Sequence, residues 1–335
     1  VTLRAAHMPA EGETDAHFQR PDLPAGFEPQ FILGHDRISG RQALALKKQF
    51  FQSAQFVLLI HTDPGDIEWF KNGHGPAGAM NEHEMRQREQ VALARQADIV
   101  MAVGPKLERA MEALLINDKK PLFSLSPGID YSDYRPRVIQ DIQCLLLGRA
   151  EDVRLKGLDI AARAIGLIDY SRLERQPRLV VRGARPQTGD ELRERLRVIA
   201  NRPGVDIRIR AYTADVDEVH SDIRRSSLVL MPSRSEGFGL VGLEAIAQGI
   251  PVLLSRQSGL AETLLKVAPA QSQASILDVL DDEREDARRW AGAIENILAR
   301  RQGAFRDALD LRAAVAKELT WHSAVEKFLV DIGVS

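Results

Sequence analysis

The feature of this sequence that most limits its fold is a regular alternation of short apolar runs with longer segments of helical period. Apolar runs of about four to eight residues, bounded by turn residues, are typical of buried strands. Parallel strands need crossover helices, so the alternation predicts an α/β fold. The first series pairs expected strands with expected helices at 30–35 and 40–51, 55–62 and 81–97, and 98–104 and 105–115, and closes with a strand in 121–128.

A second series follows residues 129–140, which have no clear period and are predicted to be a linker. It pairs 144–148 with 155–168, 178–183 with 189–200, 205–212 with 216–225, and 227–233 with 239–248, and ends with 251–255 and a long helical tail. A chain of 335 residues is long enough for two domains of about 100–200 residues each. We therefore expect two doubly wound sheets that face a cleft, with domains at 1–135 and 136–318 and a C-terminal helix at 319–335 that crosses back to the first domain. Such sheets bind ligands at the carboxyl ends of their strands.

Composition excludes several classes of function. A net charge of −2 gives no global field that favours nucleic acid. No apolar run reaches the roughly 18 residues of a membrane-spanning helix. The single cysteine, Cys144, rules out a disulfide framework and predicts a reducing, cytoplasmic compartment. Six of the eight histidines precede residue 84, but their spacing fits no metal-binding template.

The stretch SRSEGFGLVGLEAIAQGIPVL, residues 233–253, carries the strongest functional signal. A buried strand ends before it, and a helix inside it stops at Gly249 with Pro251 beyond. Gly237 and Gly239 allow positive φ at a helix start, where free amides attract phosphate. Glu236 lies in the turn and Glu244 lies in an apolar setting that favours hydroxyl partners. The competing interpretation is one acid that favours the helix dipole and one surface acid.

This stretch resembles the Glu-x7-Glu motif of retaining, nucleotide-sugar-dependent glycosyltransferases of the glycogen-synthase-like group (group 1, GT-B fold). It matches the pattern E-x-F-G-L-x-x-x-E-A, followed by G-x-P-V, at every position. The resemblance implies two Rossmann-like domains and a nucleoside-diphosphate sugar as donor substrate, with no cofactor and no metal. It also implies that Glu236 contacts the donor sugar and Glu244 the ribose. The amides that would hold the diphosphate belong to Gly237, Phe238, Gly239 and Leu240.

A second segment, GRAEDVRLKG, resembles the G-R-x-x-x-x-K-G segment of the same family. The resemblance implies that Arg149 and Lys156 neutralise the leaving diphosphate. One extra residue separates them here, so Arg154 is an alternative to Lys156. A solvated charge cluster at the start of an amphipathic helix is the other interpretation.

Further positions follow from the resemblance. His61, at a strand end, is expected near the donor sugar and the acceptor, although a local hydrogen bond would also explain it. His35 and Asp36 are expected on the acceptor side. Tyr212 and Thr213 are expected to touch the nucleobase.

Three sequence features point away from the main interpretation or remain outside it. Asp215-Val216-Asp217 spells an acidic metal-binding motif of a different glycosyltransferase fold, but here it is expected to cap a helix. Residues 73–84 are expected to form a mobile loop over the acceptor. The strand 1–6 resembles the second strand of the family, so the initial strand–loop–helix unit is expected to be absent.

We therefore expect a metal-independent hexosyltransferase-type enzyme that moves a sugar from a nucleoside-diphosphate sugar, with UDP favoured, to an unidentified acceptor by front-face substitution. The alternative is a catalytically weak nucleotide-sugar-binding module of a larger protein. A sugar-nucleotide epimerase is a further alternative, which the Glu-x7-Glu motif disfavours. Base, sugar, acceptor and oligomeric state are not determined by the sequence.

Overall fold

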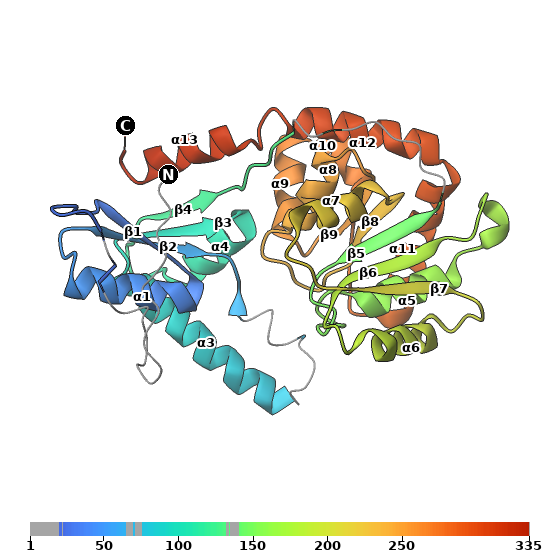
Figure 1. The fold of residues 1–335 in the computed structure, drawn as a ribbon, viewed down its shortest axis with the longest axis horizontal. Helices are drawn as coiled ribbons and strands as arrows, with labels where there is room; N and C mark the ends of the chain where they lie inside the picture. The colour runs from blue at the N-terminus through green and yellow to red at the C-terminus, as the bar shows by residue number, and fades with distance from the viewer. Residues whose placement is uncertain are drawn as a thin grey trace.

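The computed structural model describes residues 20–21, 23–64, 70, 76–131, 134 and 141–334. Within them the chain forms two parallel β-sheets that lie side by side, each covered by helices (Figure 1). This confirms the predicted α/β class with two parallel sheets. The predicted strand at 1–6 and most of the predicted linker lie outside the described residues, and the proposed domain limits remain a prediction.

The first sheet contains four parallel strands in sequential order, β1-β2-β3-β4. Its strands are β1 (Phe31–His35), β2 (Gln55–Ile60), β3 (Ile99–Val103) and β4 (Leu122–Leu125). The crossover helices are α1 (Asp36–Gln49), α3 (Pro76–Gln96) and α4 (Pro105–Leu114). Sequential order has no reversal, so among the described strands this sheet is wound in one sense only.

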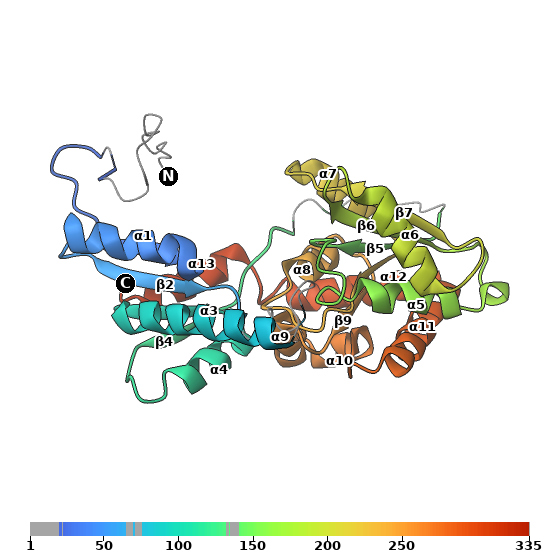
Figure 2. The ribbon, with the colours of Figure 1, turned by 90° about the horizontal axis from the view of Figure 1, so that it is seen from below.

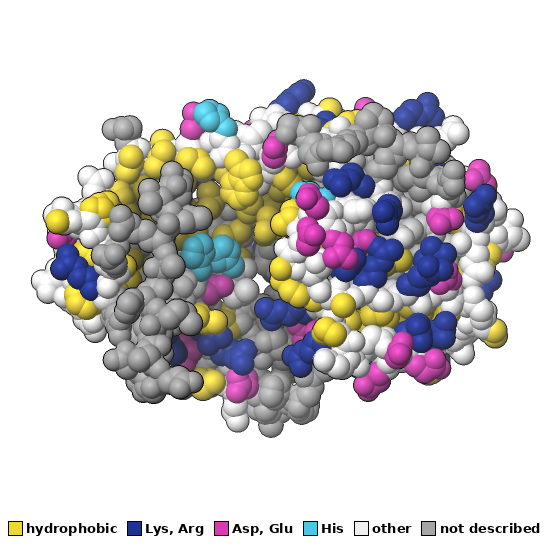
Figure 3. Space-filling view, viewed as in Figure 1, with side chains coloured by type: hydrophobic (Ala, Val, Ile, Leu, Met, Phe, Trp, Pro, Cys, Tyr) yellow, Lys and Arg dark blue, Asp and Glu magenta, His cyan; other side chains and the backbone are white. Residues whose placement is uncertain are grey.

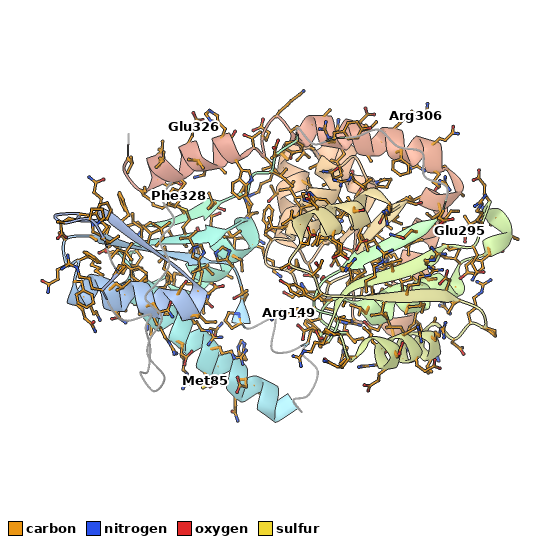
Figure 4. The ribbon with its side chains drawn as sticks, viewed as in Figure 1. Met85, Arg149, Glu295, Arg306, Glu326 and Phe328 are labelled. Atoms are coloured by element: carbon orange, nitrogen blue, oxygen red, sulfur yellow. The ribbon has the colours of Figure 1, made fainter. Side chains whose placement is uncertain are left out.

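The two faces of the first sheet are covered by different parts of the chain. Phe56, Leu58 and Val100 pack with residues of α1, α3 and α4. The opposite face, which includes Val57 and Met101, packs against α13 (Trp321–Asp331) and the residues that follow it. Figures 1 and 2 both show α13 over the first sheet, although α12 belongs to the second half. In Figure 4, Phe328 lies on α13, and it packs against this face.

The second sheet has the order β10-β9-β8-β5-β6-β7. Its strands are β5 (Gln143–Leu147), β6 (Arg178–Ala184), β7 (Asp206–Ala211), β8 (Leu228–Met231), β9 (Val252–Ser255) and β10 (Ile276–Leu277). From β5 the chain builds outward to β7 and then returns to the other side of β5 with β8. The reversal between β5 and β8 is the switch point at which doubly wound sheets open a crevice for ligands.

Alternate residues of the buried strands of the second sheet point to two separate cores. Cys144 and Leu146 of β5 face one core, while Leu145 faces the other. The helices of the first core are α5 (Leu158–Leu167), α6 (Gly189–Ala200) and α11 (Glu283–Ala299). Those of the second are α7 (Val216–Arg224), α8 (Leu240–Ala247), α9 (Gly259–Val267) and α12 (Arg301–Val315). Because both faces are covered, the inner strands β5, β8 and β9 are largely continuous apolar runs, whereas the edge strand β7 alternates apolar and polar residues.

Two expectations about local structure were wrong. Residues 76–84 are not a loop, because α3 begins at Pro76; residues 73–75 lie outside the described part. The tail after β9 is not purely helical, because Ile276 and Leu277 add the edge strand β10 after the short helix α10 (Pro269–Ser272). No helix among the described residues is long and apolar enough to cross a membrane.

Candidate active site between the two sheets

A cavity of about 260 Å³ lies at the switch point of the second sheet and is closed on one side by the first half. Histidine atoms (cyan) border the hollow between the two halves in Figure 3. From the first half, His61 after β2 and Val103 of β3 reach the cavity. The second half supplies the ends of β5 and β8 and the glycine turn that precedes α8. The predicted site residues that line the cavity are His61, Lys156, Glu236, Phe238, Gly239 and Leu240.

An ion pair marks the polar side of this cavity. Lys156 Nζ donates to Glu236 Oε2 at 2.7 Å, and Ser233 Oγ contacts the same carboxylate oxygen at 3.4 Å. The side chains of Lys156 and Glu236 are 21% and 20% exposed, so both charges remain reachable from the cavity. Lys156 and Glu236, which belong to different sequence motifs, are therefore in direct contact.

Lys156 is held in place by the backbone that follows it. Gly157 has φ +68°, and a Cβ atom there would lie 2.0 Å from the carbonyl oxygen of Pro232. Only glycine allows this close approach of the α5 start to the end of β8. Arg154, the alternative cation, lies outside the cavity lining and donates to Asp281 at 3.2 Å with its side chain 53% exposed. The geometry therefore places Lys156, and not Arg154, beside Glu236.

Arg234, which no sequence motif indicated, holds these segments together. Its guanidinium donates two hydrogen bonds to Asp159, at 2.9 and 2.8 Å, and one to Asp281 at 2.5 Å. It also donates to the carbonyl of Arg154 at 2.6 Å. The side chain is only 1% exposed. An arginine inside a turn made mainly of serine and glycine was the available signal, since a buried guanidinium requires acidic partners.

The glycine turn is shaped by contact with the first half. A Cβ atom at Gly237 would lie 2.5 Å from the carbonyl oxygen of His61. The ring of Phe238 is buried and packs against Gly104. A Cβ atom at Gly104 would lie only 2.6 Å from Cδ2 of that ring. Gly239 has φ +106° and precedes the first residue of α8, Leu240. The turn therefore runs between the two halves and ends at a helix N-terminus, where amides lack intrahelical partners.

Glu244 lies inside α8 and does not belong to the cavity lining. Burial raises the pKa of its carboxyl group above the ordinary value of 4.5. Among the causes of this shift there is no cation, so no ion pair in the described part of the chain offsets the burial of Glu244. A partly buried carboxylate of this kind is suited to accept hydrogen bonds from hydroxyl groups.

On the opposite wall, two histidines form a stacked pair. His35 Nδ1 and His61 Nε2 are 2.6 Å apart, and the rings lie 4.9 Å apart at 22°. Asp36, which has φ +45°, accepts hydrogen bonds from the His61 amide at 2.9 Å and from the Thr62 hydroxyl at 3.3 Å. The three positions named for the acceptor side and the donor sugar thus form one cluster at the end of β1 and β2.

The charge state of His61 gives a testable pH dependence. Burial lowers its pKa from 6.5, the carboxylate of Asp36 opposes this, and His35 lowers it further. Below pH 6.5 the imidazole of His61 is therefore protonated in the unfolded chain but still neutral in the folded chain. The stability contributed by neutral His61 is lost as the pH falls through 6.5 toward the folded pKa. We expect the urea midpoint to drop between pH 7.5 and pH 5.5 and the drop to shrink in H61Q. The control H322Q, at a side chain 82% exposed, should keep the full drop; an equal drop in H61Q and wild type would contradict the assignment.

The remaining predicted residues lie around the cavity. Arg149 is exposed directly after the cavity residue Gly148, and Figure 4 shows it at the edge of the second half next to the gap. Tyr212, 71% exposed, and Thr213 follow β7, farther along the same sheet edge. Asp215 caps α7, accepting from the amides of Asp217 and Glu218 at 2.9 and 3.4 Å. No group of three or more metal-ligating side chains occurs in the described ranges.

Comparison with known proteins places the chain in a family. The model of the family 4 glycosyltransferases in conflict systems matches residues 1–328. A curated relative, the D-inositol 3-phosphate glycosyltransferase of Jonesia denitrificans, is 28% identical over 294 residues, which is 82% of this chain and 66% of the relative. The chain spans less than two thirds of the length of this relative and of two further relatives from Corynebacterium species, whose covered share is 64% each.

Solved structures share the fold. Sucrose-phosphate synthase from Thermosynechococcus elongatus has a TM-score of 0.70 at 23% identity, with 90% of this chain and 72% of that chain covered. A mutant of S. aureus TarM, in complex with Fondaparinux, alpha-GlcNAc-glycerol and UDP, has a TM-score of 0.62 at 14% identity, with 86% and 53% covered. These neighbours confirm the GT-B arrangement of two Rossmann-like halves. Since the family model matches nearly the whole chain, the chain belongs to the family 4 glycosyltransferases in conflict systems.

Proposed function

We propose that this chain transfers a sugar with retention from a nucleoside-diphosphate sugar, with UDP favoured, to an acceptor. The observation that carries the proposal is the Lys156–Glu236 ion pair at 2.7 Å in a cavity between β5, β8 and the strand-end His61. A cation beside a carboxylate at a switch point suits a ligand that carries both phosphate and sugar hydroxyls. The UDP in the TarM complex, a fold neighbour, supports the choice of base.

In this proposal the bound donor breaks the Lys156–Glu236 ion pair. Sugar hydroxyls replace Lys156 as hydrogen-bond donors to Glu236, and the ammonium turns to the diphosphate together with Arg149. Negative charge grows on the diphosphate as the glycosidic bond breaks, and the two cations stabilise it. The amides at the start of α8 hold the phosphates. His61 stays neutral and faces the sugar.

A single carboxylate among the described lining residues supports front-face substitution. Among the described residues that line the cavity, Glu236 is the carboxylate, and it is paired with Lys156. A double displacement needs a nucleophile on the face opposite the leaving diphosphate, and in this proposal Glu236 accepts hydrogen bonds from the sugar hydroxyls instead. The acceptor hydroxyl therefore attacks on the face from which the diphosphate leaves, and it gives its proton to the departing phosphate.

Binding and turnover on a panel of UDP-glucose, UDP-N-acetylglucosamine, GDP-mannose and ADP-glucose test this function. Calorimetry gives the affinity, release of the nucleoside diphosphate gives the turnover, and proton NMR of the first sugar released gives its anomeric form. We expect one donor to bind and to release the α-anomer first. A β-anomer would contradict retention; binding without turnover would favour the nucleotide-sugar-binding module, and no binding at all would contradict the proposal.

Glu244 should show a conflict between stability and binding. Because its folded pKa is raised, the ionised carboxylate costs stability at neutral pH, and that cost disappears below pH 4.5. We expect E244Q to raise the melting temperature at pH 7 by about 2 °C and to lower the affinity for the donor roughly tenfold. The control E194Q, at a side chain 72% exposed, should change neither. A lower melting temperature in E244Q, or unchanged donor affinity, would contradict the role assigned to this acid.

The remaining parts of the proposal are metal independence and a cytoplasmic location. The first follows from the two cations, which take the place that a metal ion would fill beside a diphosphate. Turnover in the presence of EDTA tests it directly, because a metal-dependent enzyme would lose its activity. Buried Cys144, which is not in a disulfide, supports a reducing compartment.

A further inference from the structure

Two cations of the first half, Lys106 and Arg109, bind the turn that carries Glu236 and the start of α9 in the second half. Lys106 Nζ donates to Ser235 Oγ at 2.9 Å and to the carbonyl oxygen of Gln257 at 3.0 Å. One helical turn later, Arg109 donates two hydrogen bonds to the carboxylate of Glu262, each at 2.6 Å. Both cations lie in the first turns of α4. Ser235 lies in the glycine turn before α8, Gln257 lies just before α9, and Glu262 lies in the first turn of α9.

The partners of Lys106 are the residues that fix the backbone of Glu236. Ser235 directly precedes Glu236 in the chain. The Glu236 amide donates to the Gln257 carbonyl at 3.2 Å, the same oxygen that Lys106 binds. Glu236 also forms an isolated parallel bridge with Ser258. The ammonium group of Lys106 therefore contacts both backbone segments of the Glu236–Ser258 bridge, which positions the cavity carboxylate.

Apolar packing at the same place makes the contact between the halves continuous. Leu107 of α4 is 1% exposed and belongs to the core that contains Phe238 and Leu260. A Cβ atom at Gly237 would be 3.4 Å from Leu107 Cδ1. The start of α4 thus packs directly under the glycine turn. Lys106 binds the first part of that turn through Ser235, and Arg109 binds the start of α9 through Glu262.

We propose that Lys106 and Arg109 are positioning residues through which the first half holds the Glu236 turn and the start of α9. The donor site of the second half then has its working geometry only while the two halves are docked. This inference rests on the proposed function for its consequence in catalysis, but the contact itself exists without donor. Lys106 is the stronger member, because its partner Ser235 is buried, whereas the Arg109 side chain is 58% exposed and its pair is screened by salt.

Hydrogen exchange of the donor-free protein tests the contact without any ligand. We expect K106M to increase exchange roughly tenfold in the amides of 234–243 and 257–264, because local opening there becomes easier. K120M is the matched control, since Lys120 Nζ donates to the Ala97 carbonyl at 2.8 Å within the first half. It should leave those amides unchanged. Equal exchange in K106M and wild type would overturn the inference.

A charge exchange tests the second contact. R109E should increase exchange in 257–264 by about threefold, and R109E/E262R should restore the wild-type rate, because the pair is formed again in the opposite sense. R95Q, which removes the Arg95–Asp118 pair of the first half, is the control. Failure of the double variant to recover, with both proteins folded, would contradict a direct role of this pair.

Catalysis supplies a separate readout. If a donor from the panel is turned over, K106M should raise the KM for that donor and lower kcat. K106R, which keeps the positive charge, should have KM and kcat close to the wild-type values. Faster exchange in K106M together with no donor binding by the wild type would leave the positioning contact standing and reject the proposed function. Unchanged exchange and unchanged kinetics would reject the positioning contact and leave the proposed function standing.

Discussion

K156M is expected to lower turnover by about 100- to 1000-fold at saturating donor, with donor affinity changed by less than about tenfold. The ammonium group lies 2.7 Å from Glu236 and lines the cavity. Its interaction with the diphosphate grows as charge develops in the transition state, so its loss affects the chemical step more than binding. Steady-state release of the nucleoside diphosphate and calorimetric titration of the same donor measure the two effects.

The matched control for K156M is R154Q, two residues away. Arg154 points to Asp281 and does not line the cavity, so this variant should keep turnover within about twofold of wild type. If R154Q lost activity and K156M kept it, the cation of the site would be Arg154 and the predicted register would be wrong. If K156M weakened binding and left the rate at saturating donor unchanged, Lys156 would serve binding only.

The strands were predictable because burial on both faces requires continuous apolar runs. The run at 144–148 corresponds to β5, Gln143–Leu147, and the run at 227–233 contains β8, Leu228–Met231. Parallel pairing then places every strand end on the same edge, which is where Lys156 and Glu236 were expected. The sequence pattern does not predict that β8 pairs with β5, because β6 and β7 lie between these strands in the chain. The 2.7 Å contact depends on that pairing.

The failures have equally specific causes. Gly73, Gly75 and Pro76 indicated a loop, but proline is favoured at the first position of a helix, and α3 begins at that residue. The contacts of Lys106 and Arg109 join residues that are 129 and 153 positions apart and lie in different halves of the chain, and the sequence at a helix start does not indicate such distant partners. Topology and docking of the halves decide these contacts, and neither is a local property of the chain.

R234M is expected to destabilise the second half by about 3–5 kcal/mol, because it leaves the buried carboxylate of Asp159 without its bidentate partner. Arg234 joins Asp159 at the start of α5 to Asp281, so its loss also loosens the segment that carries Lys156. Unfolding in urea, followed by fluorescence of the fully buried Trp290, measures the change.

Two further variants separate a lost ion pair from a general packing defect. R163Q removes the exposed pair with Glu283 and should cost less than about 1 kcal/mol. R234M/D159N removes the unpaired buried charge as well and should recover part of the loss in R234M, because most of the penalty comes from the carboxylate left behind. If R234M cost no more than R163Q, Arg234 would not organise this site. If the double variant were as unstable as the two single losses added together, the guanidinium would act by packing and not through Asp159.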